Sequence, residues 1–184
     1  MVLYLKLLEE HSERHPEFPR SFFFTPNASS MIDRPDYSYK RMAGWFKNVS
    51  LLSYELLFFV VNVGGNHWVL FVAEWDRKLI TAYDSLNHLT DRHPFFPHIV
   101  RYLVDRSSPR TKSVSRGKTK VVRMDEPEGL TADGWTFKVD LSSPQQDNGY
   151  DCGIFALQNA RCLSERRRFN YSAQVGVCVR VWRK

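Results

Sequence analysis

Three consecutive apolar segments, residues 55–63, 67–75 and 78–86, constrain the fold of this chain more than any other feature of its sequence. They are rich in Val, Ile, Phe, Trp and Tyr, the residues that favour β-strands. The middle segment, HWVLFVAEW, is apolar almost throughout, which is typical of a strand buried on both faces. The sequence therefore predicts a central sheet, and a hydrophobic content of 43% over 184 residues suffices for one domain with a substantial core.

The second and third segments are predicted to form a hairpin around a tight turn at residues 76–77. In that register Trp75 pairs with Lys78, and every later pair follows from this one. His67 and Asp84 then lie on the same face of the sheet as diagonal neighbours, with about 7 to 8 Å between their backbones. We therefore expect their side chains to meet.

A cysteine lies at the start of a predicted helix in the segment PQQDNGYDCGIFALQNA, residues 144–160. Asn-Gly at 148–149 is a turn signal, and the apolar residues that follow favour a buried helix. Cys152 then belongs to the first turn of that helix. Unpaired backbone amides in this position stabilise a thiolate and lower the pKa of the thiol, so the segment predicts a reactive cysteine.

Together these residues meet the requirements of covalent acyl transfer. The reaction needs a thiolate nucleophile, a histidine that later protonates the leaving amine, and a carboxylate that orients the histidine. Cys152, His67 and Asp84 supply these parts, and the amide of Gln146, six residues before the cysteine, could donate to the oxyanion beside the backbone N–H of the cysteine itself. Each residue alone is compatible with a structural role, but the hairpin register independently joins two of them.

Two histidines near the end of a first helix, predicted over residues 2–15, raise the question of a metal. His11 and His15 are four residues apart, but no third ligand is near, so a polar helix face is the favoured interpretation. The three cysteines form no Cys-x-x-Cys pair and are odd in number, which suggests neither a disulfide framework nor a sulfur-rich zinc site. We expect no metal and no cofactor. A further short strand is predicted within residues 134–143.

The charge of the chain is uneven. Its formal net charge is +6, and the segment RSSPRTKSVSRGKTKVVR, residues 106–123, carries seven Lys or Arg and no acid. Such a segment could bind nucleic acid or act as a nuclear address, but no aromatic residues are interleaved for base stacking, so we expect a solvated basic surface loop. No apolar stretch approaches the roughly 18 to 20 residues that span a bilayer, and no secretory signal follows Met1. We expect an intracellular monomer of the nucleus or cytoplasm that contacts neither membrane nor nucleic acid.

Two segments resemble the Ulp1/SENP family of cysteine proteases, which process and remove small ubiquitin-like modifiers. The segments are HWVLFVAEWDRKLITAYDSL and PQQDNGYDCGIFALQNA. The His-Trp pair, the Tyr-x-Asp-Ser-Leu strand end and the Pro-Gln-Gln-x-Asn-Gly-x-Asp-Cys-Gly box match, with seventeen positions from His to Asp and six from Gln to Cys. A looser similarity extends from the first helix to about Tyr171. The resemblance implies an α+β, papain-like fold over residues 1–184, with a mixed central sheet and the nucleophile helix packed against it.

The resemblance also implies residue roles. Cys152 would be the nucleophile, His67 the general base and acid, Asp84 its orienter, and Gln146 the oxyanion donor. Trp68 matches the tunnel tryptophan, which in the family lies over a Gly-Gly tail; an indole packed in the core is the alternative. The implied activity is hydrolysis after the C-terminal Gly-Gly of a ubiquitin-like modifier, SUMO by family majority, to deconjugate it from lysine or to mature its precursor.

Several alternatives remain open. The modifier could instead be NEDD8 or ubiquitin, and the chain could be a non-cleaving module that only binds the modifier. An acetyltransferase of the same clan would use a similar triad on acyl-CoA, and nucleic-acid binding through the basic segment would show a steep salt dependence.

Two departures from the family pattern lie at the ends of the chain. The family usually begins with a Trp-Leu-x-Asp segment before the first helix, whereas this chain starts within that helix, so we expect a truncated N-terminal edge and an incomplete modifier-docking surface. The family closes with a charged helix. Here the tail SAQVGVCVRVWRK, residues 172–184, alternates valines in the manner of a strand.

Overall fold

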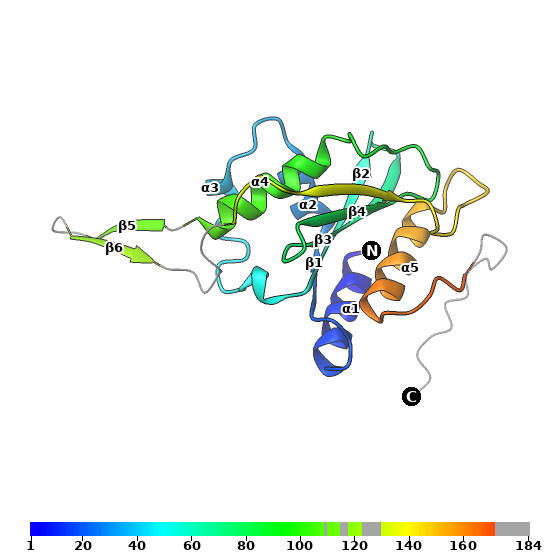
Figure 1. The fold of residues 1–184 in the computed structure, drawn as a ribbon, viewed down its shortest axis with the longest axis horizontal. Helices are drawn as coiled ribbons and strands as arrows, with labels where there is room; N and C mark the ends of the chain where they lie inside the picture. Colours follow the sequence, from blue (N-terminus) through cyan, green and yellow to red (C-terminus); the bar gives the residue numbers. More distant parts are fainter. Residues whose placement is uncertain (109, 115–117, 123–129, 172–184) are drawn as a thin grey trace.

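The structure is a computed structural model that describes residues 1–108, 110–114, 118–122 and 130–171. Figure 1 shows helices on both faces of a central sheet, with a separate pair of strands beside it. The elements, in chain order, are α1 (Val2–Arg14), β1 (Ser21–Phe24), α2 (Pro26–Asp33), α3 (Tyr39–Met42), the 3₁₀ turn η1 (Leu51–Ser53), β2 (Leu56–Val63), β3 (His67–Glu74), β4 (Leu79–Tyr83), α4 (Phe95–Ser107), β5 (Arg110–Val114), β6 (Lys118–Val122), β7 (Thr136–Asp140) and α5 (Cys152–Ser164).

The main sheet has five strands in the order β1-β2-β3-β4-β7. The strands β2, β3 and β4 form an antiparallel meander, and β1 and β7 add to its two sides in parallel. The central strand β3 is buried from Val69 to Ala73, as its continuous apolar run predicted. The sheet is therefore mixed, as expected.

Alternate residues of the inner strands belong to two separate cores. Phe59 and Phe71 pack with α2 and α4 on one face, whereas Phe58 and Leu70 pack with α1 and α5 on the other. Helix α5 lies directly against β3. The predicted α+β arrangement, with a nucleophile helix packed on a mixed sheet, is confirmed.

The hairpin between β3 and β4 has the predicted register. Its ladder runs from the pair Leu70–Tyr83 to the pair Glu74–Leu79. The strands end one pair earlier than predicted, because residues 75–78 form the turn. This difference does not shift the pairing, so residues at the other end of the hairpin remain where the sequence predicted them.

Trp75, the first residue of the turn, contacts the core and the segment before β2. Its indole N–H donates to the backbone oxygen of Tyr54 at 2.9 Å, and its ring packs against the core. Lys78 closes the turn through an N–H bond of 3.2 Å to the oxygen of Trp75, and it adopts a φ of 47°.

The basic segment differs from the expected surface loop. Arg106 belongs to α4 and is only 1% exposed, and its guanidinium donates to the oxygens of Phe46, at 2.8 Å, and of Val49. Further along, β5 and β6 pair with each other in a two-stranded sheet of their own. Thr and Val, which favour strands, make up five of the ten residues of β5 and β6. Figure 1 shows this pair projecting from the end of α4, away from the main sheet.

Helices α2 and α4 were not predicted from the sequence. Each has a proline in its first turn, Pro26 in α2 and Pro97 in α4. Proline usually indicates the end of a helix, but in the first turn its missing N–H removes no hydrogen bond of the helix. Within the described part of the chain, no helix combines the length and the apolarity that a bilayer crossing requires. The valine-rich tail, residues 172–184, lies outside the described residues.

Candidate active site

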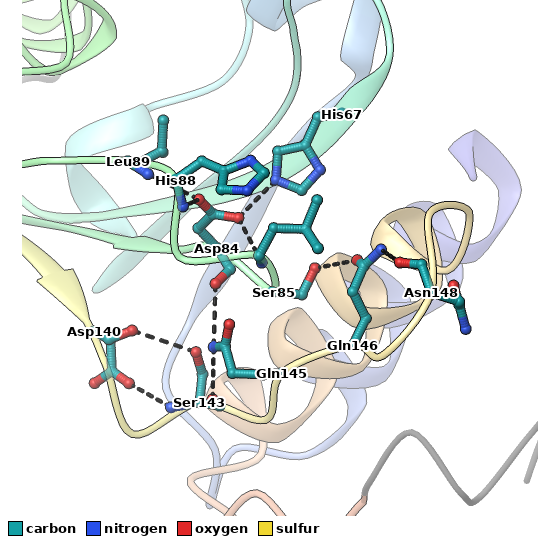
Figure 2. A network of polar contacts seen from close by, with 11 residues as sticks. His67, Asp84, Ser85, His88, Leu89, Asp140, Ser143, Gln145, Gln146 and Asn148 are labelled. Atoms are coloured by element: carbon teal, nitrogen blue, oxygen red, sulfur yellow. Dashed lines mark hydrogen bonds and ion pairs between the residues drawn. The ribbon is translucent and has the colours of Figure 1, made fainter.

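His67 and Asp84 meet at one end of the sheet, as the hairpin register predicted. His67 is the first residue of β3, and Asp84 directly follows β4. Nε2 of the imidazole lies 2.6 Å from Oδ1 of the carboxylate (Figure 2). The histidine is 9% exposed and the aspartate 0%, so this hydrogen bond is shielded from water.

The Asp84 carboxylate is held by the backbone that follows it. It accepts N–H bonds from Leu86 at 2.9 Å, from His88 at 2.7 Å and from Leu89 at 3.0 Å (Figure 2). Burial by itself would raise the pKa of this carboxyl. The backbone hydrogen bonds and the one from His67 outweigh burial and keep the pKa of Asp84 below its ordinary value. Asp84 is therefore a fixed negative charge near neutral pH.

This arrangement sets the tautomer of His67. An ionised carboxylate only accepts hydrogen bonds, so the proton of the bond to Asp84 resides on Nε2 and leaves a lone pair on Nδ1. That nitrogen is buried and has no hydrogen-bond partner among the residues that the structure describes. A buried, unpaired nitrogen costs about 1 to 3 kcal/mol, and here it is ready to accept a proton.

Cys152 opens helix α5, as predicted, and is 5% exposed. The preceding residue, Asp151, makes no side-chain cap to the helix; its carboxylate instead accepts from the Asn148 amide at 2.8 Å. The backbone oxygen of Asp151 accepts the N–H of Ile154 at 2.8 Å, and the thiol lies at the positive end of the helix dipole. The thiol is not hydrogen-bonded to Nδ1 of His67, a separation often seen before substrate binds.

Gln146 is hydrogen-bonded to Ser85, which directly follows Asp84 in the chain. Its backbone N–H donates to the oxygen of Ser85 at 2.9 Å, and its side-chain oxygen accepts from the Ser85 hydroxyl at 2.6 Å (Figure 2). Its Nε2 donates to the backbone oxygen of Asn148. An amide nitrogen carries two protons, so one remains for another acceptor.

The neighbouring Gln145 adds a second link between the same two segments. Its Nε2 donates to the backbone oxygen of Asp84 at 3.2 Å and to that of Ser143 at 3.0 Å. The sequence alone suggested no role for Gln145 or for Ser85. Their positions directly beside Gln146 and Asp84 were the only signal that could have suggested one.

Trp68 lies against the beginning of α5. A Cβ atom added at Gly153 would be 3.3 Å from Cδ1 of the indole and 3.3 Å from Cε of Met1. The ring also packs on the core formed by α1, α5 and the sheet. Trp68 thus borders the residue that follows Cys152 and also packs on the core.

The described residues contain no group of three or more His, Cys, Asp or Glu side chains that could hold a metal ion. His11 and His15 have ring centroids 4.3 Å apart, but each also faces a carboxylate. Nδ1 of His15 lies 2.9 Å from Glu17, and Nε2 of His11 lies 3.7 Å from Glu165. These contacts fit the polar helix face that the sequence favoured.

Known proteins match this chain over almost its whole length. The model of the Ulp1 protease family, C-terminal catalytic domain, matches residues 1–180. The chain is 27% identical to a sentrin-specific protease of Caenorhabditis elegans over 164 residues, which are 89% of this chain and 20% of that protein. It is 26% identical to sentrin-specific protease 3 of Homo sapiens over 174 residues, 95% of this chain and 26% of that protein. The chain thus spans about a quarter or less of the length of these relatives.

Two solved structures share the fold. The C-terminal Ulp1 protease domain in complex with Smt3, the yeast orthologue of SUMO, has a TM-score of 0.64 at 19% identity, covering 93% of this chain and 68% of that one. The Xanthomonas campestris effector XopD, bound to ubiquitin, has a TM-score of 0.56 at 16% identity, covering 90% of this chain and 74% of that one.

Proposed function

The chain belongs to the Ulp1 protease family, and we propose that it is a cysteine peptidase that hydrolyses the bond after the C-terminal Gly-Gly of a ubiquitin-like modifier. The observation that supports this most strongly is the buried hydrogen bond between His67 and Asp84, which leaves Nδ1 of the imidazole unpaired. Helix α5, packed on the strand that begins with His67, carries the thiol of Cys152.

In the proposed reaction, Nδ1 of His67 takes the proton of the Cys152 thiol. The thiolate attacks the carbonyl carbon of the terminal glycine, and the negative charge moves to the carbonyl oxygen. The oxyanion accepts the backbone N–H of Cys152 and the second Nε2 proton of Gln146. Asp84 keeps the proton of its bond on Nε2 of the imidazole and stabilises the imidazolium.

Collapse of the tetrahedral intermediate breaks the carbon–nitrogen bond. The leaving amine, a lysine amine in a conjugate or an α-amine in a precursor, takes the proton from Nδ1 of His67. Water then attacks the thioester while His67 again accepts a proton. The second collapse releases the glycine carboxylate and restores the thiol of Cys152.

Trp68 supports a requirement for glycine next to the scissile bond. Its indole lies over Gly153, directly beside the nucleophile. A side chain on the incoming tail would compete with the indole for this space, whereas Gly-Gly would not. We therefore propose that Trp68 covers the tail of the modifier.

SUMO is the modifier that we propose. The curated relatives are sentrin-specific proteases, and the Ulp1 domain was solved with the yeast orthologue of SUMO. Ubiquitin is the second candidate, because XopD shares the fold and was solved with ubiquitin. A non-cleaving binding module and an acetyltransferase are less favoured, because the chain retains all four proposed catalytic residues.

The test is incubation with SUMO, NEDD8 and ubiquitin that carry C-terminal electrophilic traps, followed by intact mass and peptide mapping. We expect one adduct, at Cys152, formed fastest with SUMO. Cys162 is an internal control because burial raises the pKa of its thiol. Cys152→Ala should form no adduct. A folded wild-type protein that reacts with none of the three traps would instead indicate a binding module or an acetyltransferase.

A further inference from the structure

Strands β4 and β7 end side by side, and the proposed catalytic residues lie just beyond their ends. The last pair of this parallel ladder is Tyr83 with Asp140. Asp84 directly follows β4, and the segment that leads to Gln146 and Cys152 follows β7. The ladder itself therefore does not fix how these two segments lie relative to each other. Their relative position depends on the contacts made beyond the ladder.

The chain turns back directly after β7. Oδ1 of Asp140 accepts the backbone N–H of Ser142 at 2.9 Å and that of Ser143 at 2.8 Å. The hydroxyl of Ser142 donates to the same oxygen at 2.9 Å. Bonds of this kind from an aspartate to the backbone that follows it stabilise a turn. Figure 2 shows that the chain then returns from Ser143 towards Asp84.

The side chain of Gln145 links the two segments. Its Nε2 donates to the backbone oxygen of Asp84 at 3.2 Å and to that of Ser143 at 3.0 Å (Figure 2). An amide nitrogen carries two protons, so both are used here. The oxygen of Asp84 also accepts the N–H of Asn87, but at 3.3 Å. The amide of Gln145 thus joins the segments that follow β4 and β7 where their ladder has ended.

The next residue makes the same connection one position further along. Gln146 donates its backbone N–H to the oxygen of Ser85 at 2.9 Å and accepts the Ser85 hydroxyl at 2.6 Å. Two consecutive residues of one segment therefore hold two consecutive residues of the other. A single point of contact leaves two segments free to rotate about it, whereas two points fix both their separation and their angle. Without the bonds of Gln145, the pair Ser85–Gln146 would act as a pivot.

We propose that Gln145 is a positioning residue of the peptidase site, which holds the backbone of Asp84 and the segment that carries Gln146 at a fixed separation. This role rests on the proposed function, in which Asp84 orients His67 and Gln146 binds the oxyanion. Because both of its amide protons are used, Gln145 itself makes no bond to the oxyanion. When its bonds are lost, the base and the oxyanion donor no longer face the same carbonyl group together. A displacement of about 1 Å at a reacting centre can lower the rate by about 100-fold.

The chemistry of the two partners makes substitutions of Gln145 diagnostic. Both partners are carbonyl oxygens, which only accept hydrogen bonds. Lysine supplies N–H donors on a long side chain, and its charge can stay hydrated because the position is only partly buried. Methionine fills the space without a donor, and glutamate would place a carboxylate against two carbonyl oxygens. A donor role therefore predicts that activity falls in the order lysine, methionine, glutamate.

The experiment is steady-state kinetics of Gln145→Lys, Gln145→Met and Gln145→Glu with a fluorogenic modifier conjugate. We expect kcat to fall by about threefold, tenfold and 100-fold in that order, while KM changes less than about twofold. The same three substitutions at Gln158, a partly buried glutamine in the middle of α5, are the matched control and should each change kcat less than about twofold. If Gln145→Met is as active as Gln145→Lys or more so, the donor role is wrong. A loss confined to KM would contradict positioning.

A second measurement needs no substrate. The proton between Nε2 of His67 and Asp84 lies in a buried bond and should give a far-downfield signal in proton NMR. We expect this signal to keep its position in Gln145→Lys and in the Gln158 variants, and to shift and broaden in Gln145→Glu as the backbone of Asp84 moves. An unchanged signal in Gln145→Glu would overturn the proposal.

The two measurements separate this inference from the proposed function. If the signal changes as expected but the wild type cleaves no modifier, the proposed function fails and the hold of Gln145 on Asp84 stands. If the wild type cleaves a modifier and all three Gln145 variants do so equally well, the inference fails alone. Urea unfolding shows whether each variant is folded, and should Gln145→Glu not fold, the comparison of Gln145→Lys with Gln145→Met decides.

Discussion

The hydroxyl of Ser85 donates a hydrogen bond of 2.6 Å to the side-chain oxygen of Gln146. This bond fixes the amide that we propose as the oxyanion donor. Ser85→Ala removes one of the two hydrogen bonds that hold the side-chain amide, the other being the bond from its Nε2 to the Asn148 oxygen, so we expect kcat to fall about tenfold while KM changes less than twofold. Steady-state kinetics with a fluorogenic modifier conjugate measure both values.

A double-mutant cycle separates this role from general damage. In a Gln146→Ala background the serine has no amide to hold, so adding Ser85→Ala should cost little more. Losses that add fully in the double variant would mean that Ser85 acts independently of Gln146.

Asp84→Asn should lower turnover by about 10³- to 10⁴-fold, because the amide no longer holds His67 in the required tautomer. It should also lower the free energy of unfolding by about 1 to 3 kcal/mol at neutral pH, since an amide NH₂ cannot accept the N–H bonds that the carboxylate accepted. Urea unfolding of both proteins measures this difference.

The stability difference between these two proteins should depend on pH. The pKa of Asp84 is lower in the folded protein than its usual value near 4, so its stabilising effect is complete above about pH 5. The effect is lost as the pH falls below the usual pKa and through the lowered one. The difference between wild type and Asp84→Asn should therefore shrink below about pH 4. A difference that stays constant from pH 7 to pH 3 would contradict the lowered pKa.

Gly153→Ala should separate activity from stability. The new Cβ would approach the indole of Trp68 to 3.3 Å and displace it by a few tenths of an ångström. We expect kcat/KM for a Gly-Gly substrate to fall about five- to twentyfold, while helix propensity leaves stability unchanged or raises it by up to about 1 kcal/mol. Gly149→Ala, whose Cβ would meet no atom within 4 Å, is the matched control and should retain activity.

Arg106→Met should destabilise the protein by about 2 to 4 kcal/mol, because the carbonyls of Phe46 and Val49 would lose a buried donor. Activity well below the unfolding transition should persist, since Arg106 is at the far end of α4 from the site. Urea denaturation provides the free energies. Arg14→Met, at a side chain that is 76% exposed, should change stability by less than about 0.5 kcal/mol.

The sequence was most informative where local rules decide the structure. The two-residue period of strands and the turn signal between them sufficed to place His67 beside Asp84, and helix-start signals located Cys152. The proposed role of these residues also needed the family resemblance. Their meeting, by contrast, followed from register alone.

Prediction from the sequence failed where a side chain bonds to a residue that is distant along the chain. The indole of Trp75 donates a hydrogen bond to the backbone oxygen of Tyr54. The guanidinium of Arg106 is buried and donates to a backbone oxygen, although Arg106 belongs to a basic segment. The contact of Ser85 with Gln146 crosses from one loop to another. Such contacts depend on the packing of the whole domain, which cannot be predicted from composition and periodicity.

The two parallel pairings of the sheet differ from the meander in how far apart their residues lie along the chain. His67 and Asp84 come together through one short hairpin, whereas α4, β5 and β6 lie between β4 and β7 along the chain. Pairings between distant segments slow folding, because the loop between them must close before the contacts can stabilise it. Helix α5 also packs on β3 from a distant part of the chain. A partial unfolding that releases α5 would leave His67 and Asp84 paired without Cys152, so gentle heating should abolish the proposed peptidase activity before the meander of β2, β3 and β4 melts.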